Sequence, residues 1–333
     1  MATIYEVSKL AGVSLATVSR VMNGTAKVST NTQKKVREAM LTLGYTPNSV
    51  AISLASKRSN CVGILVAELG GLFFGDMMSG IESQLRARNK HVVITASHGR
   101  LKDEEDGIKF LISRNCDAIV VHAEKLSDDY LIELSKGKTP IYILNRFIPE
   151  LAERCVSLDN VQGGYLAAKY VLEQGHREVA IIVGPGYKKD AVQRLEGCKK
   201  AFAEMQVELP EANVYEGTFL EDSGAEGVDA FIQAKLSFSA LICGNDQMAI
   251  GAMARLRDHG LIPAKDVAII GFDDVKFASC TYPRLTTIKY PVWDMGKMTA
   301  NLLLKQVYNL DKEVISRSFE PTLIVRDSVH KLP

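Results

Sequence analysis

The sequence predicts an α/β protein in which a small helical head precedes a larger core of two lobes, each built on a doubly wound parallel sheet. Two observations predict this class. Before residue 60 the apolar residues recur at helical spacing, whereas from residue 61 onward short β-branched runs alternate with amphipathic stretches. Continuous apolar runs separated by helices are typical of parallel strands covered on both faces, and they occur about twice as often as one ordinary sheet needs.

Three helices are expected in the head, which covers residues 1–45. The first ends at Gly12, because glycine terminates helices. Ser14 can cap the second helix, LATVSRVMN, since its hydroxyl can accept a hydrogen bond from a backbone amide of the first turn. Ser29 is expected to cap the third helix, which ends at Gly44.

The core is expected to divide into two lobes that change over near Asp159 and Asn160, with a possible return crossing at 286–291. Its predicted strands cover residues 62–67, 91–96, 117–122, 140–144, 179–183, 240–244 and 267–271. The predicted division is a head at 1–45, a hinge helix and linker at 46–60, and a core at 61–333, whose N-terminal lobe takes 61–159 and 290–321 and whose C-terminal lobe takes 160–287 and 322–333.

Charge is distributed unevenly along the chain. Residues 1–60 hold eight basic and two acidic residues, a formal charge of +6, whereas the whole chain carries only +1. Such an asymmetry is expected when one end of a protein meets a polyanion. A solvated basic surface fits the charge equally well, so charge alone does not decide between the two.

Several classes of protein are disfavoured by the composition. Six cysteines are scattered without a CxxC pair, which argues against a zinc site and against a disulfide framework. The chain shows neither an apolar N-terminal run of the secretory type nor a stretch approaching the roughly 18 apolar residues of a membrane span. The histidines lack metal-ligand spacing, and no nucleophile and base are evident. We therefore expect a cytoplasmic protein that is not an enzyme and holds no metal or cofactor.

Two short helices joined by a tight glycine turn match a helix-turn-helix, in which the second helix enters the DNA major groove. Leu15 and Ala16 could contact thymine methyl groups but cannot donate hydrogen bonds. Thr17 and Ser19 could bond phosphates or bases, and Arg20 could bind a guanine through two hydrogen bonds. An ordinary helical hairpin is the alternative, because this pattern by itself is weak evidence.

Longer strings extend the interpretation. ATIYEVSKLAGVSLATVSRVMNG resembles the N-terminus of the LacI/GalR family of bacterial transcriptional repressors. YTPNSVAISLA resembles the family's hinge helix, and NDQMAIGAM and VAIIGFDDV match strings of its effector-binding core. Within the family, likeness to galactose operon repressors is carried by FFGDMMSGIE, DAIVVHAE, NRFIPELAERCVSLDN, EQGH and YPRLTTIKYPV. The resemblance implies a core like that of periplasmic sugar-binding proteins.

The resemblance also implies where DNA is contacted. The expected residues are Thr3, Ser14, Leu15, Ala16, Thr17, Ser19, Arg20, Asn23, Ser29, Tyr45, Asn48, Ala51 and Leu54. Leu54 matches a hinge leucine that, in the family, wedges into the minor groove at the centre of the site. An apolar wedge of this kind unstacks one base step and kinks the duplex. Packing of Leu54 against the core is the alternative.

A sugar effector is expected in the cleft between the lobes, where polar side chains follow the strands. Sugars are bound by side chains that form two hydrogen bonds to neighbouring hydroxyls and by an aromatic ring against their C–H face. The resemblance places Phe74, Asn145, Arg146, Arg194, Phe219, Asn245 and Asp273 at effector-contacting positions. Asp246 is expected instead to cap the helix that follows it.

The predicted function is that of a sugar-responsive repressor that binds a palindromic DNA operator as a homodimer and is released by galactose or a related glycoside. Two alternatives belong to other classes. A periplasmic-type sugar-binding protein would have such lobes, but the missing signal and the basic head oppose it. A sugar-processing enzyme needs an acid and a base or a metal, and the sequence shows neither clearly.

Overall fold

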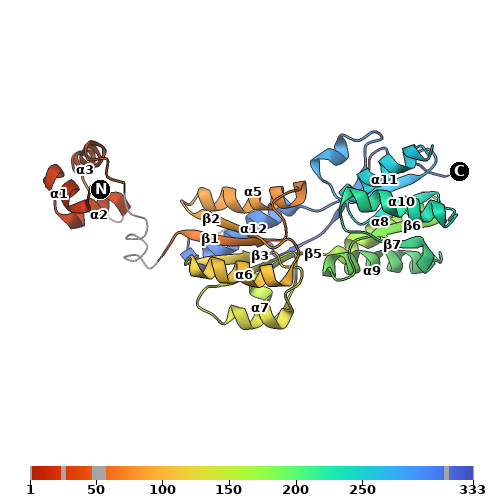
Figure 1. The fold of residues 1–333 in the computed structure, drawn as a ribbon, viewed down its shortest axis with the longest axis horizontal. Helices are drawn as coiled ribbons and strands as arrows, with labels where there is room; N and C mark the ends of the chain where they lie inside the picture. The colour runs from red at the N-terminus through yellow and green to blue at the C-terminus, as the bar shows by residue number, and fades with distance from the viewer. Residues whose placement is uncertain (1, 24–27, 47–57, 311–314, 333) are drawn as a thin grey trace. The chain divides into compact units, whose positions relative to one another are not determined.

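The computed structural model describes residues 2–23, 28–46, 58–310 and 315–332. The chain forms two compact units, Met1–Asn60 and Cys61–Pro333, and Figure 1 labels their elements. The first unit is the helical head and the second contains the two sheets. Within the described residues, no helix combines the length and apolar character needed to cross a membrane.

The head is a three-helix unit around a small apolar core. Its helices are α1 (Ile4–Ala11), α2 (Leu15–Asn23) and α3 (Thr30–Thr42). Val7, Val18 and Val36, one from each helix, are fully buried against each other. The apolar positions spaced at helical intervals therefore meet on the inside, which leaves the opposite face of α2 to the solvent.

Each helix of the head is capped by a hydroxyl that the sequence analysis had assigned to DNA. Thr3 forms a capping box with Glu6 at the start of α1. Ser14 Oγ accepts from the Thr17 amide at 3.2 Å, and Ser29 Oγ accepts from the Thr32 amide at 3.3 Å. These bonds satisfy amides that a helix end leaves without an intrahelical partner. The cap predictions for Ser14 and Ser29 are confirmed.

The core contains two six-stranded sheets. The N-terminal lobe has the order β11-β5-β4-β3-β1-β2, and the C-terminal lobe has the order β12-β10-β9-β8-β6-β7. Every pairing is parallel except that of β10 with β12. The strands are β1 (Cys61–Val66), β2 (His91–Ala96), β3 (Ala118–Val121), β4 (Ile141–Leu144), β5 (Cys155–Leu158), β6 (Val179–Val183), β7 (Val214–Glu216), β8 (Ala240–Cys243), β9 (Ala268–Asp273), β10 (Thr286–Lys289), β11 (Ser318–Phe319) and β12 (Thr322–Ile324).

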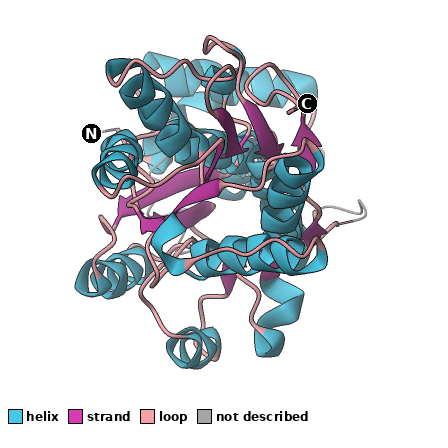
Figure 2. Ribbon diagram, turned by 90° about the vertical axis from the view of Figure 1, so that its right-hand side faces the viewer, coloured by secondary structure: helices cyan, strands magenta, loops and turns pink. Residues whose placement is uncertain are grey.

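Helices cover both faces of each sheet, as Figures 1 and 2 show. The helices of the core are α5 (Leu72–Arg86), α6 (Leu101–Ser113), α7 (Asp128–Ser135), α8 (Asn160–Glu173), α9 (Lys189–Glu204), α10 (Glu221–Gln233), α11 (Asp246–Asp258) and α12 (Val292–Tyr308). Each of the seven predicted runs forms a strand. The segment expected as a return crossing instead begins with β10, and the chain crosses to the N-terminal lobe after it, where α12 packs on α5.

Three helix pairs pack at unusually close range: α8 with α9, α5 with α12, and α10 with α11. In each pair, a glycine on either helix meets the backbone of the other. An added Cβ would overlap a carbonyl oxygen of the partner helix at Gly164, Gly197, Gly80, Gly296, Gly224 and Gly251. Glycine permits this approach because it has no side chain, so these six positions set the spacing of the helix layers.

Candidate functional site

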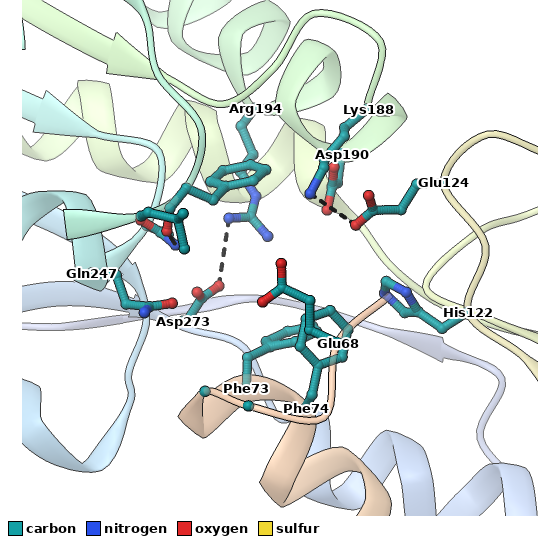
Figure 3. A pocket seen from close by; sticks show the side chains of 15 residues that line it. Glu68, Phe73, Phe74, His122, Glu124, Lys188, Asp190, Arg194, Gln247 and Asp273 are labelled. Atoms are coloured by element: carbon teal, nitrogen blue, oxygen red, sulfur yellow. Dashed lines mark hydrogen bonds and ion pairs between the residues drawn. The ribbon is translucent and has the colours of Figure 1, made fainter. Parts of the chain in front are cut away.

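A cavity of about 230 Å³ lies between the two lobes of the core, where the carboxyl ends of parallel strands face each other. This volume is several times the ~30 Å³ that a single liquid water occupies, so the cavity accommodates a small organic molecule. Figure 3 shows charged and aromatic side chains that point into it. Its lining comprises Glu68, Gly70, Gly71, Phe73, Phe74, His122, Glu124, Lys188, Asp190, Arg194, Phe219, Leu220, Asn245, Gln247 and Asp273.

Arg194, on the second turn of α9, is the most firmly held cation of the lining. Its side chain is 7% exposed, and its Nε donates to Asn160 Oδ1 at 3.0 Å. Its Nη1 donates to the Gly244 carbonyl at 2.6 Å and lies 3.4 Å from Asp273 Oδ1. The guanidinium also stacks on the Phe272 ring, 3.7 Å from the centroid. These contacts fix a planar donor fork at the cavity wall.

Asp273 ends strand β9 and faces Arg194 across the cavity floor (Figure 3). It has a φ of +109°, and Asp274 after it has a φ of +56°. Such values are uncommon for residues with a side chain and often occur at functional sites. Burial raises the pKa of Asp273 to about 7, although the Arg194 charge acts in the opposite direction.

Ligand affinity should therefore fall as the pH falls from 8 to 6. A carboxylate accepts hydrogen bonds from ligand hydroxyls only where it is ionised, and with a pKa of about 7 the ionised fraction drops about tenfold over this range. Burial lowers the pKa of His122, so its ring stays neutral throughout. Isothermal titration of D-galactose at the two pH values checks this. An Asp273→Asn variant should bind weakly without the pH slope, and equal wild-type affinity at both values would contradict the prediction.

Aromatic rings form two walls of the cavity. Phe219, with a φ of +71°, lies directly on the backbone of Gly184, where an added Cβ would overlap the ring. On the N-terminal lobe, Phe73 and Phe74 are in edge-to-face contact with ring centroids 5.3 Å apart. A sugar ring presents C–H groups on its faces, so such walls suit it while polar groups bind its hydroxyls.

The loop after β3 brings a second charged pair to the cavity. Lys188 Nζ lies 2.8 Å from Glu124, and Figure 3 marks this pair beside Asp190. The loop is held by Glu104, a fully buried carboxylate of α6, which accepts from the backbone amides of Glu124, Lys125 and Leu126. A carboxylate with several amide donors tolerates burial well, so Glu104 positions the loop.

The structure brings Phe74, Arg194, Phe219, Asn245 and Asp273 to this cavity, but not Asn145 and Arg146. Asn145 Nδ2 donates to Asp190 Oδ2 at 3.3 Å. Arg146 donates to the Leu126 carbonyl and pairs with Asp128 of α7, which also binds Lys189 of α9. The two residues therefore take part in contacts that join the lobes beside the cavity.

Asn245, and not Asp246, caps helix α11, so the cap prediction for Asp246 was wrong. The Asn245 Oδ1 accepts from the Met248 amide, and its Nδ2 donates to the Phe219 carbonyl. Asp246 is fully buried and accepts from Thr287 Oγ1 at 2.6 Å and from the Val275 amide at 2.8 Å. It therefore anchors the loop that carries Asp273.

Several lining residues were not predicted from the sequence: Glu68, Phe73, His122, Glu124, Lys188, Asp190 and Gln247. A signal existed for the first four, since all of them follow β1 or β3 at the same edge of the sheet as the predicted residues. His122 is 7% exposed, and neither ring nitrogen has a partner among the described residues. Among those residues, no group of three or more acidic, His or Cys side chains could hold a metal ion.

In the head, the residues predicted to contact DNA gather on α2. Ala16 and Arg20 are exposed, whereas Leu15, Thr17 and Ser19 are half-buried. Tyr45 packs against the core of the head. The side chain of Asn23 lies outside the described part of the structure, as do Asn48, Ala51 and Leu54.

Comparison with known proteins gives matches to both units. Residues 3–48 match the family of bacterial regulatory proteins of the lacI type, and residues 168–329 match the periplasmic binding protein-like domain. The HTH-type transcriptional regulator GalR of Escherichia coli (strain K12) is 35% identical over 329 residues, which are 99% of this chain and 96% of the relative.

Solved structures agree along the whole chain. The lac repressor dimer bound to operator and the anti-inducer ONPF is similar with a TM-score of 0.87 at 27% identity, and the match covers 99% of either chain. The complex of the transcriptional regulator CelR with cellobiose has a TM-score of 0.72 at 28% identity, covering 98% of this chain and 100% of the other. With a relative of this identity over nearly its full length and a matching head, the chain belongs to the LacI family of bacterial regulatory proteins.

Proposed function

We propose that this transcriptional regulator, which is not an enzyme, is a homodimeric repressor that binds a palindromic operator in the cytoplasm and is released by a small neutral sugar, galactose or a related glycoside. The observation that carries the effector class is the lining of the cavity, in which a guanidinium fork and carboxylates lie between aromatic walls. Carboxylates accept hydrogen bonds from hydroxyls, and the fork donates to them. In the similar CelR structure, the bound molecule is the neutral sugar cellobiose.

The charge of the cavity favours an unphosphorylated sugar. The lining contains the carboxylates of Glu68, Glu124, Asp190 and Asp273 and the cations Lys188 and Arg194. Each cation already has an acidic partner, Glu124 or Asp273. A phosphate would therefore meet net negative charge without a spare cation in the described lining, which costs binding energy.

The head supplies the operator contacts in this proposal. Helix α2 presents Ala16 and Arg20 to the solvent, while Val18 on its other face is fully buried. Small side chains let the helix approach the major groove, and an arginine can recognise guanine through two hydrogen bonds. Two heads are needed to bind both halves of a palindrome, so the repressor acts as a dimer.

Ligand closure couples the two sites. A sugar that binds Arg194 on the C-terminal lobe and Phe74 on the N-terminal lobe draws the lobes together. We propose that closure shifts the N-terminal lobes of the dimer and separates the hinge segments at 46–60, so that the Leu54 wedges leave the minor groove. The loss of operator affinity then equals the preference of the sugar for the closed state.

The test is a titration of the protein on a fluorescent palindromic duplex of the galactose-repressor type, with and without millimolar D-galactose. We expect specific binding that galactose weakens. An Arg20→Ala variant should lower operator affinity by about tenfold or more, because it removes a base contact and leaves the cavity unchanged. A scrambled duplex is the control. Absence of specific binding would refute the repressor, whereas binding that galactose leaves unchanged would reject galactose alone.

A further inference from the structure

A second cavity of about 200 Å³ adjoins the effector cavity. It lies between the first turn of α5, the loop after β9 and the start of α12, and Phe73 and Asp273 line both cavities. Its other lining residues are Asp76, Asp274, Val275, Lys289, Tyr290, Pro291, Val292, Trp293 and Asp294. We call this second cavity the outer groove.

The outer groove has the chemistry of a carbohydrate subsite. Trp293, the single tryptophan of the chain, is 41% exposed there and offers an indole plane to a sugar face. Asp76 and Asp294 are exposed acceptors for hydroxyl groups, and Lys289 is an exposed donor. An aromatic plane surrounded by acceptors and donors is the pattern that binds a pyranose.

A buried hydroxyl supplies independent support. Tyr290 lines the outer groove and is 3% exposed, and its phenol oxygen has no partner among the described residues. Its ring is held by Phe73, with centroids 5.0 Å apart, so the hydroxyl cannot turn freely to the solvent. A buried polar group that lacks a partner is costly, and a ligand hydroxyl in the groove would satisfy it.

We propose that the effector is a disaccharide or a comparable two-ring glycoside: one ring occupies the cavity at Arg194, and the second passes Phe73 and Asp273 to lie on Trp293 in the outer groove. This inference rests on the proposed function and specifies its ligand class. Because residues of both lobes line the groove, the second ring adds contacts across the cleft and strengthens closure. A monosaccharide fills only the inner cavity and binds more weakly.

The test compares two monosaccharides with two disaccharides, D-galactose with lactose and D-glucose with cellobiose, on the full-length protein. We expect at least one disaccharide to bind about tenfold or more tightly than its monosaccharide in isothermal titration. That disaccharide should shift the emission of Trp293, which reports the groove alone since the chain has no other tryptophan. The monosaccharide should leave the emission unchanged.

Two variants separate the groove from the inner cavity. Trp293→Ala should remove the advantage of the disaccharide and leave monosaccharide affinity unchanged. The matched control is Phe110→Ala on α6, an aromatic residue that is equally exposed, at 40%, and lines neither cavity. Monosaccharide binding without a disaccharide advantage, or an advantage that survives Trp293→Ala, would overturn the second subsite alone. No binding of any of the four sugars would contradict the proposed function as well.

Discussion

Replacing Arg194 with methionine is expected to abolish effector binding while operator binding persists. Methionine keeps much of the length of the side chain but removes the donor fork, which contacts Asn160, the Gly244 carbonyl and Asp273. Asp273 then loses the cation that favours its ionised form. Losing charge-assisted hydrogen bonds in a buried site costs about 1.5–3 kcal/mol each, so affinity should fall on the order of a hundredfold or more.

Isothermal titration with the effector and operator titration with the same variant check this expectation. The variant should bind the operator like the wild type and stay bound at sugar concentrations that release the wild type. Arg86→Met is the control, because Arg86 is an exposed residue of α5 whose ion pair with Glu82 lies on the surface. An Arg194→Met protein that sugar still releases would show that the cavity is not the effector site.

Replacing Gly197 with valine is expected to destabilise the C-terminal lobe by about 3 kcal/mol or more. Gly197 on α9 lies against the Val161 carbonyl of α8, and Gly164 on α8 lies against the Arg194 carbonyl of α9. A side chain at either position must overlap a rigid backbone, so the two helices have to separate. Overpacking of this kind typically costs 1–3 kcal/mol, and more where nothing flexible can move away.

Urea unfolding measures this loss as a lower transition midpoint. Gly75→Val is the matched control, because Gly75 also lies within a helix, α5, and an added Cβ there meets no atom within 4 Å. The Gly197→Val protein should also lose effector affinity, since Arg194 is one helical turn away on the displaced helix. If both glycine variants unfold at the same midpoint, the close α8–α9 packing does not control stability.

Local patterns in the sequence were sufficient for the secondary structure and its caps. The β-branched runs form strands at the predicted places, and Ser14 and Ser29 cap the helices that follow them. These features depend on neighbours within a few residues, so sequence spacing contains the needed information. The short strands β11 and β12 were missed because two or three residues show no periodicity.

The composition of the cavity was decided only by tertiary structure. Arg194 and Asp273 could be predicted as strand-end or helix-start residues, yet their 3.4 Å contact joins positions 79 residues apart. Asn145 and Arg146 also follow a strand, but the contacts between the lobes direct them to Asp190 and Asp128 instead.

Period and spacing thus determined which residues reach the edge of each sheet. They did not determine which of two adjacent polar residues faces the cavity, as the exchange of roles between Asn245 and Asp246 illustrates. That choice depends on partners from distant segments, such as Thr287 for Asp246. Burial forces every polar group to find such a partner, and only the folded arrangement of the two lobes supplies it.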